Sequence, residues 1–201
     1  MTTIESDATT TPDAPPRTAS QRLASAIHAL GRAMNAADAG GGSMSAGELA
    51  ALRRLDPDAP WSTHFYRRIV WLEATCGVLL AADSARRDED ERRWAVIFNG
   101  MAITAGLHRD GIPAGAALGR CISEARFVRL AQARGASLRG IVRTTARQLA
   151  SAGEPLDWTA LARLVLSEGQ DHEDDVRRDL ARAFFGELHK HTKTERAADE
   201  D

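Results

Sequence analysis

Seven arginines lie within residues 118–150, a stretch that contains a single acidic residue, Glu124. The stretch therefore carries a net charge of +6 inside a chain whose formal charge at pH 7 is −2. Guanidinium groups bind carboxylates and phosphates through paired, charge-assisted hydrogen bonds. The chemistry that this concentration of arginine indicates is the binding of an anion.

Two helices separated near Gly135 are expected to position these arginines. Ser123 is suited to cap the first helix, in which Phe127 and Leu130 would be buried, and Gly135 would follow its end. With Phe127 facing inward, the stretch offers no aromatic platform on which a base could stack. The second helix, residues 136–150, has an apolar face made of Leu138, Ile141, Val142, Thr145 and Leu149.

Arg139, Arg143 and Arg147 recur every four residues along the second helix. This spacing places them about 6 Å apart along the axis and outside the apolar arc, as a ladder facing away from the core. A solvated surface helix is the alternative, since arginine favours helices. Such a surface normally interleaves glutamate four residues away, which is almost missing here. The pattern therefore favours an anion-binding face.

The elements around this stretch are expected to be helical. All seven prolines fall outside the helical patterns, and no segment alternates polar and apolar residues as a half-buried strand does. We expect an all-α protein, a compact bundle of about eight or nine helices. The helices that can be placed cover about residues 20–35, 46–55, 64–81, 94–107, 124–134, 136–150, 158–166 and 173–190.

Charge and composition divide the chain into three parts. Residues 1–19 are polar and rich in Pro and Thr, and are predicted to be a disordered N-terminal tail. Residues 20–190 would form the helical bundle domain, and residues 191–201 an acidic, disordered C-terminal tail. Residues 83–93 are expected to be a charged connection, and residues 108–117 a loop.

No pattern in the sequence indicates an enzyme, a cofactor or a metal site. The six histidines have neither the H-E-x-x-H spacing nor cysteine partners, and the acidic run at 171–175 is typical of a solvated helix start. Gly115 and Gly119 lack the Lys-Ser/Thr pair of a phosphate loop. The apolar segments are too short to span a membrane, and two scattered cysteines with no signal peptide indicate the cytoplasm.

Six motifs in a fixed order carry a resemblance. They are G-E-L-A-A-L-R-R (47–54), H-F-Y-R-R-I (64–69), R-R-W-A-V-I-F-N-G-M-A (92–102), L-G-R (118–120), S-E-A-R-F-V-R-L (123–130) and G-E-P-L-D-W-T-A-L-A-R-L (153–164). This series resembles the CasB family, the small subunit of the type I-E CRISPR surveillance complex Cascade. The resemblance covers about residues 45–190, and each motif is weak by itself.

The resemblance implies a non-catalytic helical subunit in antiviral defence. Family members form a dimer within the complex, beside the backbone and large subunits and the guide RNA, and help to hold the target and displaced DNA strands of the R-loop. The family's basic positions correspond to Arg53, Arg54, Arg120, Arg126 and Arg129. Arg139, Arg143 and Arg147 come from helical geometry and match less firmly. Residues 106–117 depart from the family pattern on the approach to Arg120.

Two other functions fit part of the pattern. The arginine face could dock acidic protein neighbours in a helical scaffold subunit. A helical transcription regulator is the third hypothesis, with a recognition helix in the major groove. Base readout favours Asn, Gln and Ser mixed with Arg, whereas the helix at 136–150 offers mostly Arg.

Overall fold

The chain is helical throughout the part that its computed structural model describes, residues 18–199. The predicted all-α class is confirmed, with one small two-stranded sheet added. The predicted tail at 1–19 lies almost entirely outside the described residues. In order, the elements are α1 Ala19–Asp38, α2 Ala46–Arg53, α3 Thr63–Cys76, α4 Ser84–Ile103, β1 His108–Pro113, α5 Ala114–Cys121, α6 Glu124–Gln132, α7 Gly135–Ala152, β2 Leu156–Asp157, α8 Thr159–Leu166 and α9 Glu173–Asp199.

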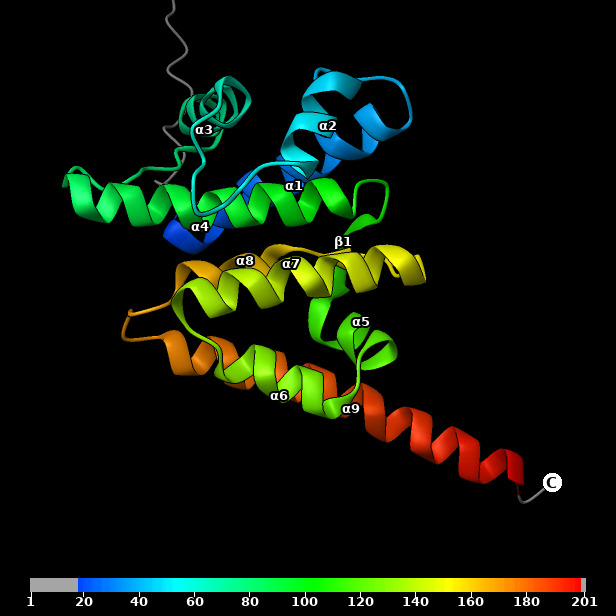
Figure 1. Cartoon of the computed structure of the whole chain (residues 1–201). Helices are drawn as coiled ribbons and strands as arrows, with labels where there is room; N and C mark the ends of the chain where they lie inside the picture. The colour runs from blue at the N-terminus through cyan, green and yellow to red at the C-terminus, as the bar shows by residue number, and fades with distance from the viewer. Residues whose placement is uncertain (1–17, 200–201) are drawn as a thin grey trace, which may run out of the picture.

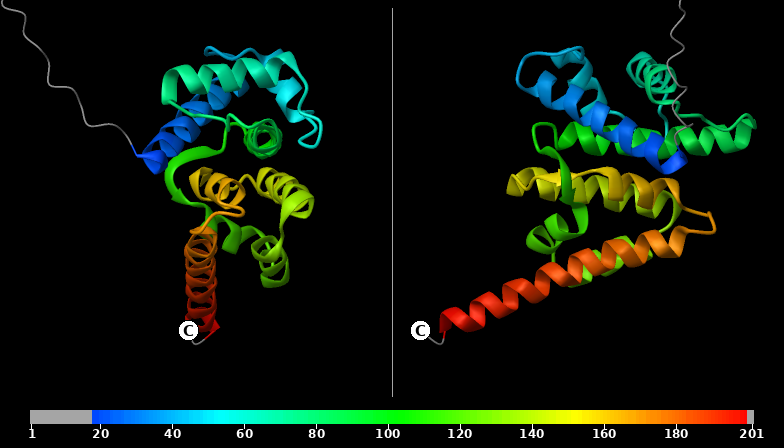
Figure 2. Two further views of the ribbon diagram at one scale, coloured as in Figure 1. Left: turned by 90° about the vertical axis from the view of Figure 1, so that its left-hand side faces the viewer. Right: turned by 180° about the vertical axis from the view of Figure 1, so that it is seen from behind.

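The helices lie in successive layers. Figure 1 shows α4 crossing the molecule, with α1, α2 and α3 on one side and α7 and α8 on the other. Helices α5, α6 and α9 lie beyond α7 and α8, and Figure 2 shows the same order from the side and from behind. Among the described elements, α5 packs on α9 and α4 packs on α7 most extensively. Helix α7 therefore lies between α4 and α6.

Local sequence explains where several helices begin. Ser45, Ser62 and Asp83 each precede a helix, and each side chain accepts a hydrogen bond from a backbone N–H in the first turn, at 3.0–3.2 Å. Such caps satisfy donors that a helix start leaves unpaired. The apolar stripes behave as predicted on α2, where Leu49 and Leu52 are 2% and 0% exposed.

The second half of α4 is the centre of the core. All residues from Trp94 to Ala102 are buried. Gly100 permits a close approach here, because a Cβ at this position would lie 2.3 Å from the indole of Trp158. That indole is fully buried and donates from Nε1 to Thr104 Oγ1 at 2.8 Å.

A buried ion pair joins α2 to α3. Arg68 Nε lies 2.6 Å from Glu48 Oε1, and the two side chains are only 6% and 5% exposed. Glu48 and Arg68 belong to the G-E-L-A-A-L-R-R and H-F-Y-R-R-I motifs respectively. Removing one member of a buried pair leaves an uncompensated charge, so these two motif residues are required by the fold.

The predicted start of α4 and the predicted end of α3 are wrong. Residues 83–93 belong to α4, because Asp83 caps the helix and Arg92 and Arg93 lie 3.6 and 3.5 Å from Glu89. Apolar periodicity misses such a charged helical start. Helix α3 ends at Cys76 and not at residue 81, since Gly77 is left-handed with φ of 67°, and Leu79 beyond it is 81% exposed.

The predicted loop at 108–117 is also wrong. It forms β1 and the start of α5, and β1 pairs in parallel with β2, with His108 opposite Leu156. A strand that pairs with only two residues has no alternating pattern to detect. Gly135, expected just beyond α6, instead begins α7 with φ of 54°. Helix α9 continues beyond the expected end at residue 190, to Asp199.

Candidate nucleic-acid interface

Helix α6 exposes Arg126 and Arg129 because its opposite side is buried. Phe127 and Leu130 are 1% and 0% exposed, and the Phe127 ring stacks on Phe184 of α9 with the ring centroids 3.9 Å apart. Among the described residues, neither of these two arginine side chains makes a hydrogen bond or an ion pair. The aromatic stack thus holds α6 with two uncompensated guanidinium groups facing solvent.

Arg177 of α9 holds the C-terminal end of α6. Its buried side chain donates from Nη1 to the carbonyl oxygen of Ala131, and from Nη2 to that of Ala133 at 3.2 Å. Nε donates to Glu173 Oε1 at 3.0 Å. The last carbonyls of a helix have no partner inside the helix, so Arg177 acts as a cap supplied by another element.

Helix α7 buries one face and exposes another. Its buried residues are Leu138, Val142, Thr145, Ala146 and Leu149, close to the predicted face. Arg147 is exposed on the same side of the helix as Thr144, three residues before it. Arg147 makes no hydrogen bond or ion pair to another described residue.

A groove of about 280 Å³ lies between α6 and α7. We call it the α6–α7 groove, and its lining consists of Arg126, Arg129, Ile141, Thr144, Thr145 and Gln148. Arg126 and Arg129 therefore bring two uncompensated guanidinium groups to the groove, whereas Arg147 is not among its lining residues. Guanidinium N–H groups and the Gln148 amide are donors suited to phosphate oxygens.

The predicted bare ladder on α7 is wrong at Arg139. This side chain is only 11% exposed and donates from Nε to Asp58 Oδ1 at 2.9 Å and from Nη1 to Glu89 Oε1 at 3.1 Å. The acids come from the loop before α3 and from α4. The absence of acids four residues away on α7 therefore did not leave Arg139 unpaired.

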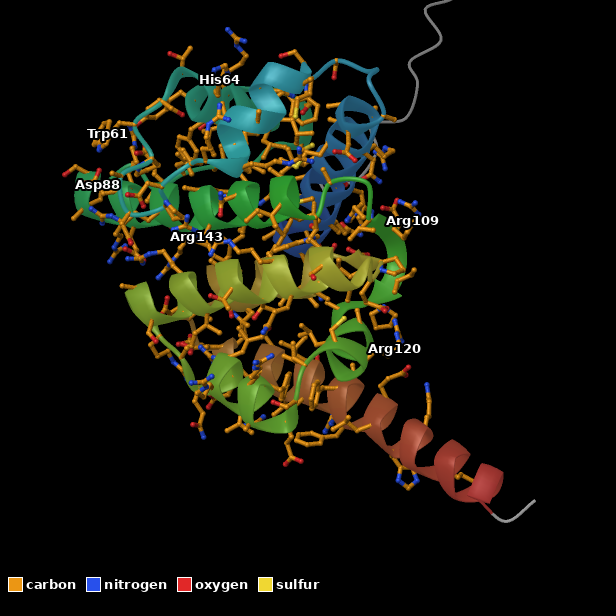
Figure 3. All side chains as sticks on the ribbon, turned by 45° about the vertical axis from the view of Figure 1, so that its right-hand side comes forward. Trp61, His64, Asp88, Arg109, Arg120 and Arg143 are labelled. Atoms are coloured by element: carbon orange, nitrogen blue, oxygen red, sulfur yellow. The ribbon has the colours of Figure 1, made fainter. Side chains whose placement is uncertain are left out.

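Arg143 lies in the seam between α4 and α7, as Figure 3 shows. It is partly buried, and its Nε donates to Asn99 Oδ1 at 3.1 Å. The Asn99 amide in turn donates to the carbonyl oxygens of Leu52 and Arg53 at 3.0 and 2.9 Å. Arg143 thus faces an amide and keeps its charge uncompensated beside the end of α2.

The two arginines at the end of α2 differ. Arg53 Nη2 lies 2.6 Å from Asp38 Oδ1, and Arg53 Nε donates to the carbonyl oxygen of Ala102 at 2.8 Å. The Arg54 side chain is exposed and makes no hydrogen bond or ion pair in the described part of the chain. The α2 motif therefore supplies one arginine whose charge is paired within the fold, Arg53, and one whose charge is uncompensated, Arg54.

Arg120 is held by two carboxylates. Its Nη2 lies 2.5 Å from Glu154 Oε1 and its Nη1 lies 2.7 Å from Glu187 Oε1. The hydrogen bond to Glu154 raises the pKa of Arg120 above its ordinary value, and the bond to Arg120 lowers the pKa of Glu187. Figure 3 places Arg120 by α5, well away from Arg143. Arg120 fastens α5 to α9.

The eight predicted site residues therefore fall into two groups. Arg126 and Arg129 line one groove, Arg143 and Arg147 lie one turn apart on α7 outside this lining, and Arg54 follows α2. Arg53, Arg120 and Arg139 are committed to carboxylates of the same chain.

A second polar cluster lies where α1 meets the small sheet. His28, His108 and Asp110 form a group of possible metal ligands within residues 18–199. Both histidines already have carboxylate partners. His108 Nε2 lies 2.9 Å from Asp110 Oδ1, and His28 Nε2 lies 3.1 Å from Oδ2 of Asp157, which adds a fourth residue to the cluster. Burial lowers the pKa of His108, outweighing its hydrogen bond to Asp110.

Asp157 is the most strongly shifted member of this cluster. Burial opposes its ionisation, but hydrogen bonds from Thr159, Gly111 and His28 outweigh burial and lower its pKa to about 2. Asp157 lies one residue before Trp158, the N-cap of α8, and its Oδ1 accepts a hydrogen bond from the Thr159 backbone N–H at 2.8 Å. The cluster joins α1, β1 and β2 as a structural junction.

Sequence reasoning missed two exposed residues near α3. Trp61 is 74% exposed, and Arg67 is exposed with no hydrogen bond or ion pair among the described residues. The signal was the cluster W-S-T-H-F-Y-R-R at 61–68, in which three aromatic residues lie within a few positions of two arginines. Because this apolar segment is expected to pack in the core, its sequence did not predict that Trp61 and Arg67 are exposed.

No helix within residues 18–199 has both the length and the apolar character to cross a bilayer.

Comparison with known proteins identifies one family. The profile of CRISPR-associated protein Cse2 matches residues 48–185. The fold is similar to that of CasB from Thermobifida fusca, with a TM-score of 0.64 and 19% identity over 81% of this chain and 97% of that one. It is also similar to a chain of E. coli Cascade bound to a PAM-containing dsDNA target, with a TM-score of 0.54 and 24% identity over 81% and 96% of the two chains. No curated protein matches.

Proposed function

The chain belongs to the Cse2 family of CRISPR-associated proteins, and from this membership we propose that it is a non-catalytic small subunit of a type I-E Cascade complex. Its task would be to hold nucleic-acid backbones and so stabilise the R-loop between guide RNA and target DNA. The observation that carries the proposal is the α6–α7 groove, lined by Arg126 and Arg129 without compensating carboxylates among the described residues.

The mechanism needs backbone affinity and no base readout. In RNA-guided complexes, base pairing between guide and target selects the sequence, while the protein contacts the backbone. Phosphate contacts by arginine release counterions, so binding weakens as salt rises. The groove offers guanidinium groups, a hydroxyl and an amide, which suit phosphate oxygens of any sequence.

Partners and boundaries form part of the same proposal. Residues 20–190 would act as one folded body, present in two copies beside the backbone and large subunits, in the cytoplasm. The chain similar in fold within E. coli Cascade is part of an assembly bound to double-stranded DNA. We propose that guide RNA and the target and displaced DNA strands are the nucleic acids that meet the groove.

A charge reversal in the assembled complex tests the proposal. The variant Arg126→Glu/Arg129→Glu should assemble normally but bind target DNA more weakly, because both side chains are exposed and hold no described partner. The matched control is Arg178→Glu/Arg182→Glu on α9, which changes the net charge equally at side chains 64% and 81% exposed. Target binding equal to wild type across a salt titration would exclude the groove.

The alternative is a scaffold subunit whose arginines dock acidic protein neighbours. Its support is that Arg53, Arg120 and Arg139 already bind carboxylates of this chain. In that case the reversed variant would fail to join the complex, and the purified chain would not shift single-stranded or duplex DNA at low salt. Assembly and DNA binding are thus measured separately.

A further inference from the structure

Trp61 is the large aromatic side chain most open to solvent among the described residues. It is 74% exposed, whereas Trp94 and Trp158 are 4% and 0% exposed and Trp71 is partly buried. It lies in the segment between α2 and α3, at the edge of the molecule in Figure 3. An indole left in water loses the burial that normally stabilises it, so its exposure points to a ligand.

Trp61 borders a shallow hollow of about 640 Å³ at the start of α3. The lining residues are Trp61, Ser62, Thr63, Tyr66, Arg67 and Val70. The Tyr66 ring lies 6.3 Å from the Trp61 ring, centroid to centroid, at an interplanar angle of 50°. Tyr66 is fixed by its hydroxyl, which donates to Glu91 Oε2 at 3.0 Å. The hollow is therefore bordered by the fixed ring of Tyr66 and the exposed ring of Trp61.

Arg67 adds a positive charge to this hollow. It is exposed on α3 and, within residues 18–199, has neither a hydrogen bond nor an ion pair. A planar aromatic ring beside an available guanidinium group is the combination that binds a base and its phosphate in single-stranded nucleic acids. The charge also distinguishes the hollow from a purely apolar docking patch.

The size of the patch favours one base over a protein partner. Specific protein interfaces bury about 20–30 residues on each side. Only two of the exposed large hydrophobic residues, Trp61 at 74% and Val70 at 59%, lie in this hollow. A surface of that extent matches a single nucleobase.

The hollow is connected to α7 through its own loop. Asp58, three residues before Trp61, accepts the ion pair from Arg139 of α7, with Nη2 and Oδ1 2.8 Å apart. Arg143 follows one turn later on α7, in the seam below Trp61 in Figure 3. The loop that carries Trp61 is thus fixed to the helix that carries the proposed backbone contacts.

We propose that Trp61, Tyr66 and Arg67 form a stacking site for one unpaired base of a single-stranded nucleic acid, such as a displaced strand. This inference rests on the proposed function, and it adds contact with a base to contact with the backbone. The indole stacks on the base, and Arg67 meets an adjacent phosphate. The site accepts any base, because stacking uses the ring face and not its edges.

The test compares two single strands of equal length on the full chain, one of thymidylate and one with abasic sugars throughout. Both carry the same phosphates, but only the first can stack. Wild type should bind the thymidylate strand roughly five- to a hundredfold more tightly. The variant Trp61→Ala should lose that preference and keep its affinity for the abasic strand.

Matched variants separate stacking from general loss of apolar surface. Leu79→Ala removes another exposed apolar side chain, one that is 81% exposed, and should keep the preference. Trp61→Phe should retain part of it. Thymidylate should also quench the fluorescence of wild type, and most of this quenching should be lost in Trp61→Phe because Trp94 and Trp158 are buried and Trp71 is partly buried.

The outcomes are distinct. If wild type binds both strands equally, the stacking site is excluded while backbone binding stands. If wild type binds neither strand, both proposals fail. If Trp61→Ala keeps the thymidylate preference, or loses only its ability to join other subunits, the hollow is a protein contact and the inference is overturned.

Discussion

Removing Arg126 and Arg129 together should change the salt dependence of single-strand binding by a calculable amount. Each phosphate that a protein neutralises on a single strand contributes a slope of about 0.7 to the fall of log affinity with log salt. Arg126 and Arg129 are exposed on α6 and uncompensated in the described chain. The variant Arg126→Ala/Arg129→Ala should therefore reduce the slope by about 1.4.

The same relation gives the loss of affinity. A slope change of about 1.4 corresponds to roughly 25-fold weaker binding at 0.1 M salt, or about 2 kcal/mol. The assay is fluorescence anisotropy of a labelled single strand with the purified chain, at several salt concentrations. Circular dichroism should show an unchanged fold, because neither side chain is buried.

Arg53→Ala provides the comparison that makes this reasoning refutable. Arg53 is 41% exposed, but its charge is matched by Asp38 at 2.6 Å, so its removal should leave the slope unchanged. A slope that falls as much in Arg53→Ala as in the double variant would show that pairing within the chain does not decide which arginines bind phosphate. An unchanged slope in the double variant would refute the groove itself.

The remaining predictions concern the fold that supports the groove. Glu48→Gln should lower the free energy of unfolding by about 3–5 kcal/mol, because it leaves Arg68 charged and buried; urea denaturation measures this, and Glu48→Gln/Arg68→Met should recover much of the loss. For Asp157, the pKa falls from 3.8 to about 2 on folding. As the pH falls, this carboxylate is therefore protonated in the unfolded chain before it is protonated in the folded chain. This carboxylate should contribute about 2 kcal/mol that is fully present above pH 4 and lost as the pH falls to about 2. Unfolding curves of wild type and Asp157→Asn should then converge at low pH, and a constant gap between them would contradict the assignment.

Short-range patterns predicted much of the fold. The stripes that contain Leu49 and Leu52 on α2, and Phe127 and Leu130 on α6, are buried as expected. These patterns depend on neighbours within two helical turns, which the sequence displays directly. The charged start of α4 was not predicted, because capping and ion pairs stabilise it and apolar periodicity does not detect these interactions.

The state of each arginine required the tertiary structure. Arg139 is paired with Asp58 and Glu89, which are 81 and 50 residues away in the chain. Arg120 is paired with Glu154 and Glu187, at separations of 34 and 67 residues. The rule that acids four residues away compensate a helical arginine describes only one helix. It therefore overestimated how much positive charge the folded chain presents.

Arg177 gives α9 an influence on a surface that it does not line. Arg177 donates hydrogen bonds to the carbonyl oxygens at the end of α6. It therefore helps to fix the position of α6, and so of Arg126 and Arg129, relative to α7. A neighbouring molecule that pulled on the projecting C-terminal helix would change the width of the groove without touching it. Binding of a nucleic-acid strand in the groove and docking of α9 in an assembly would then be coupled through the guanidinium group of Arg177.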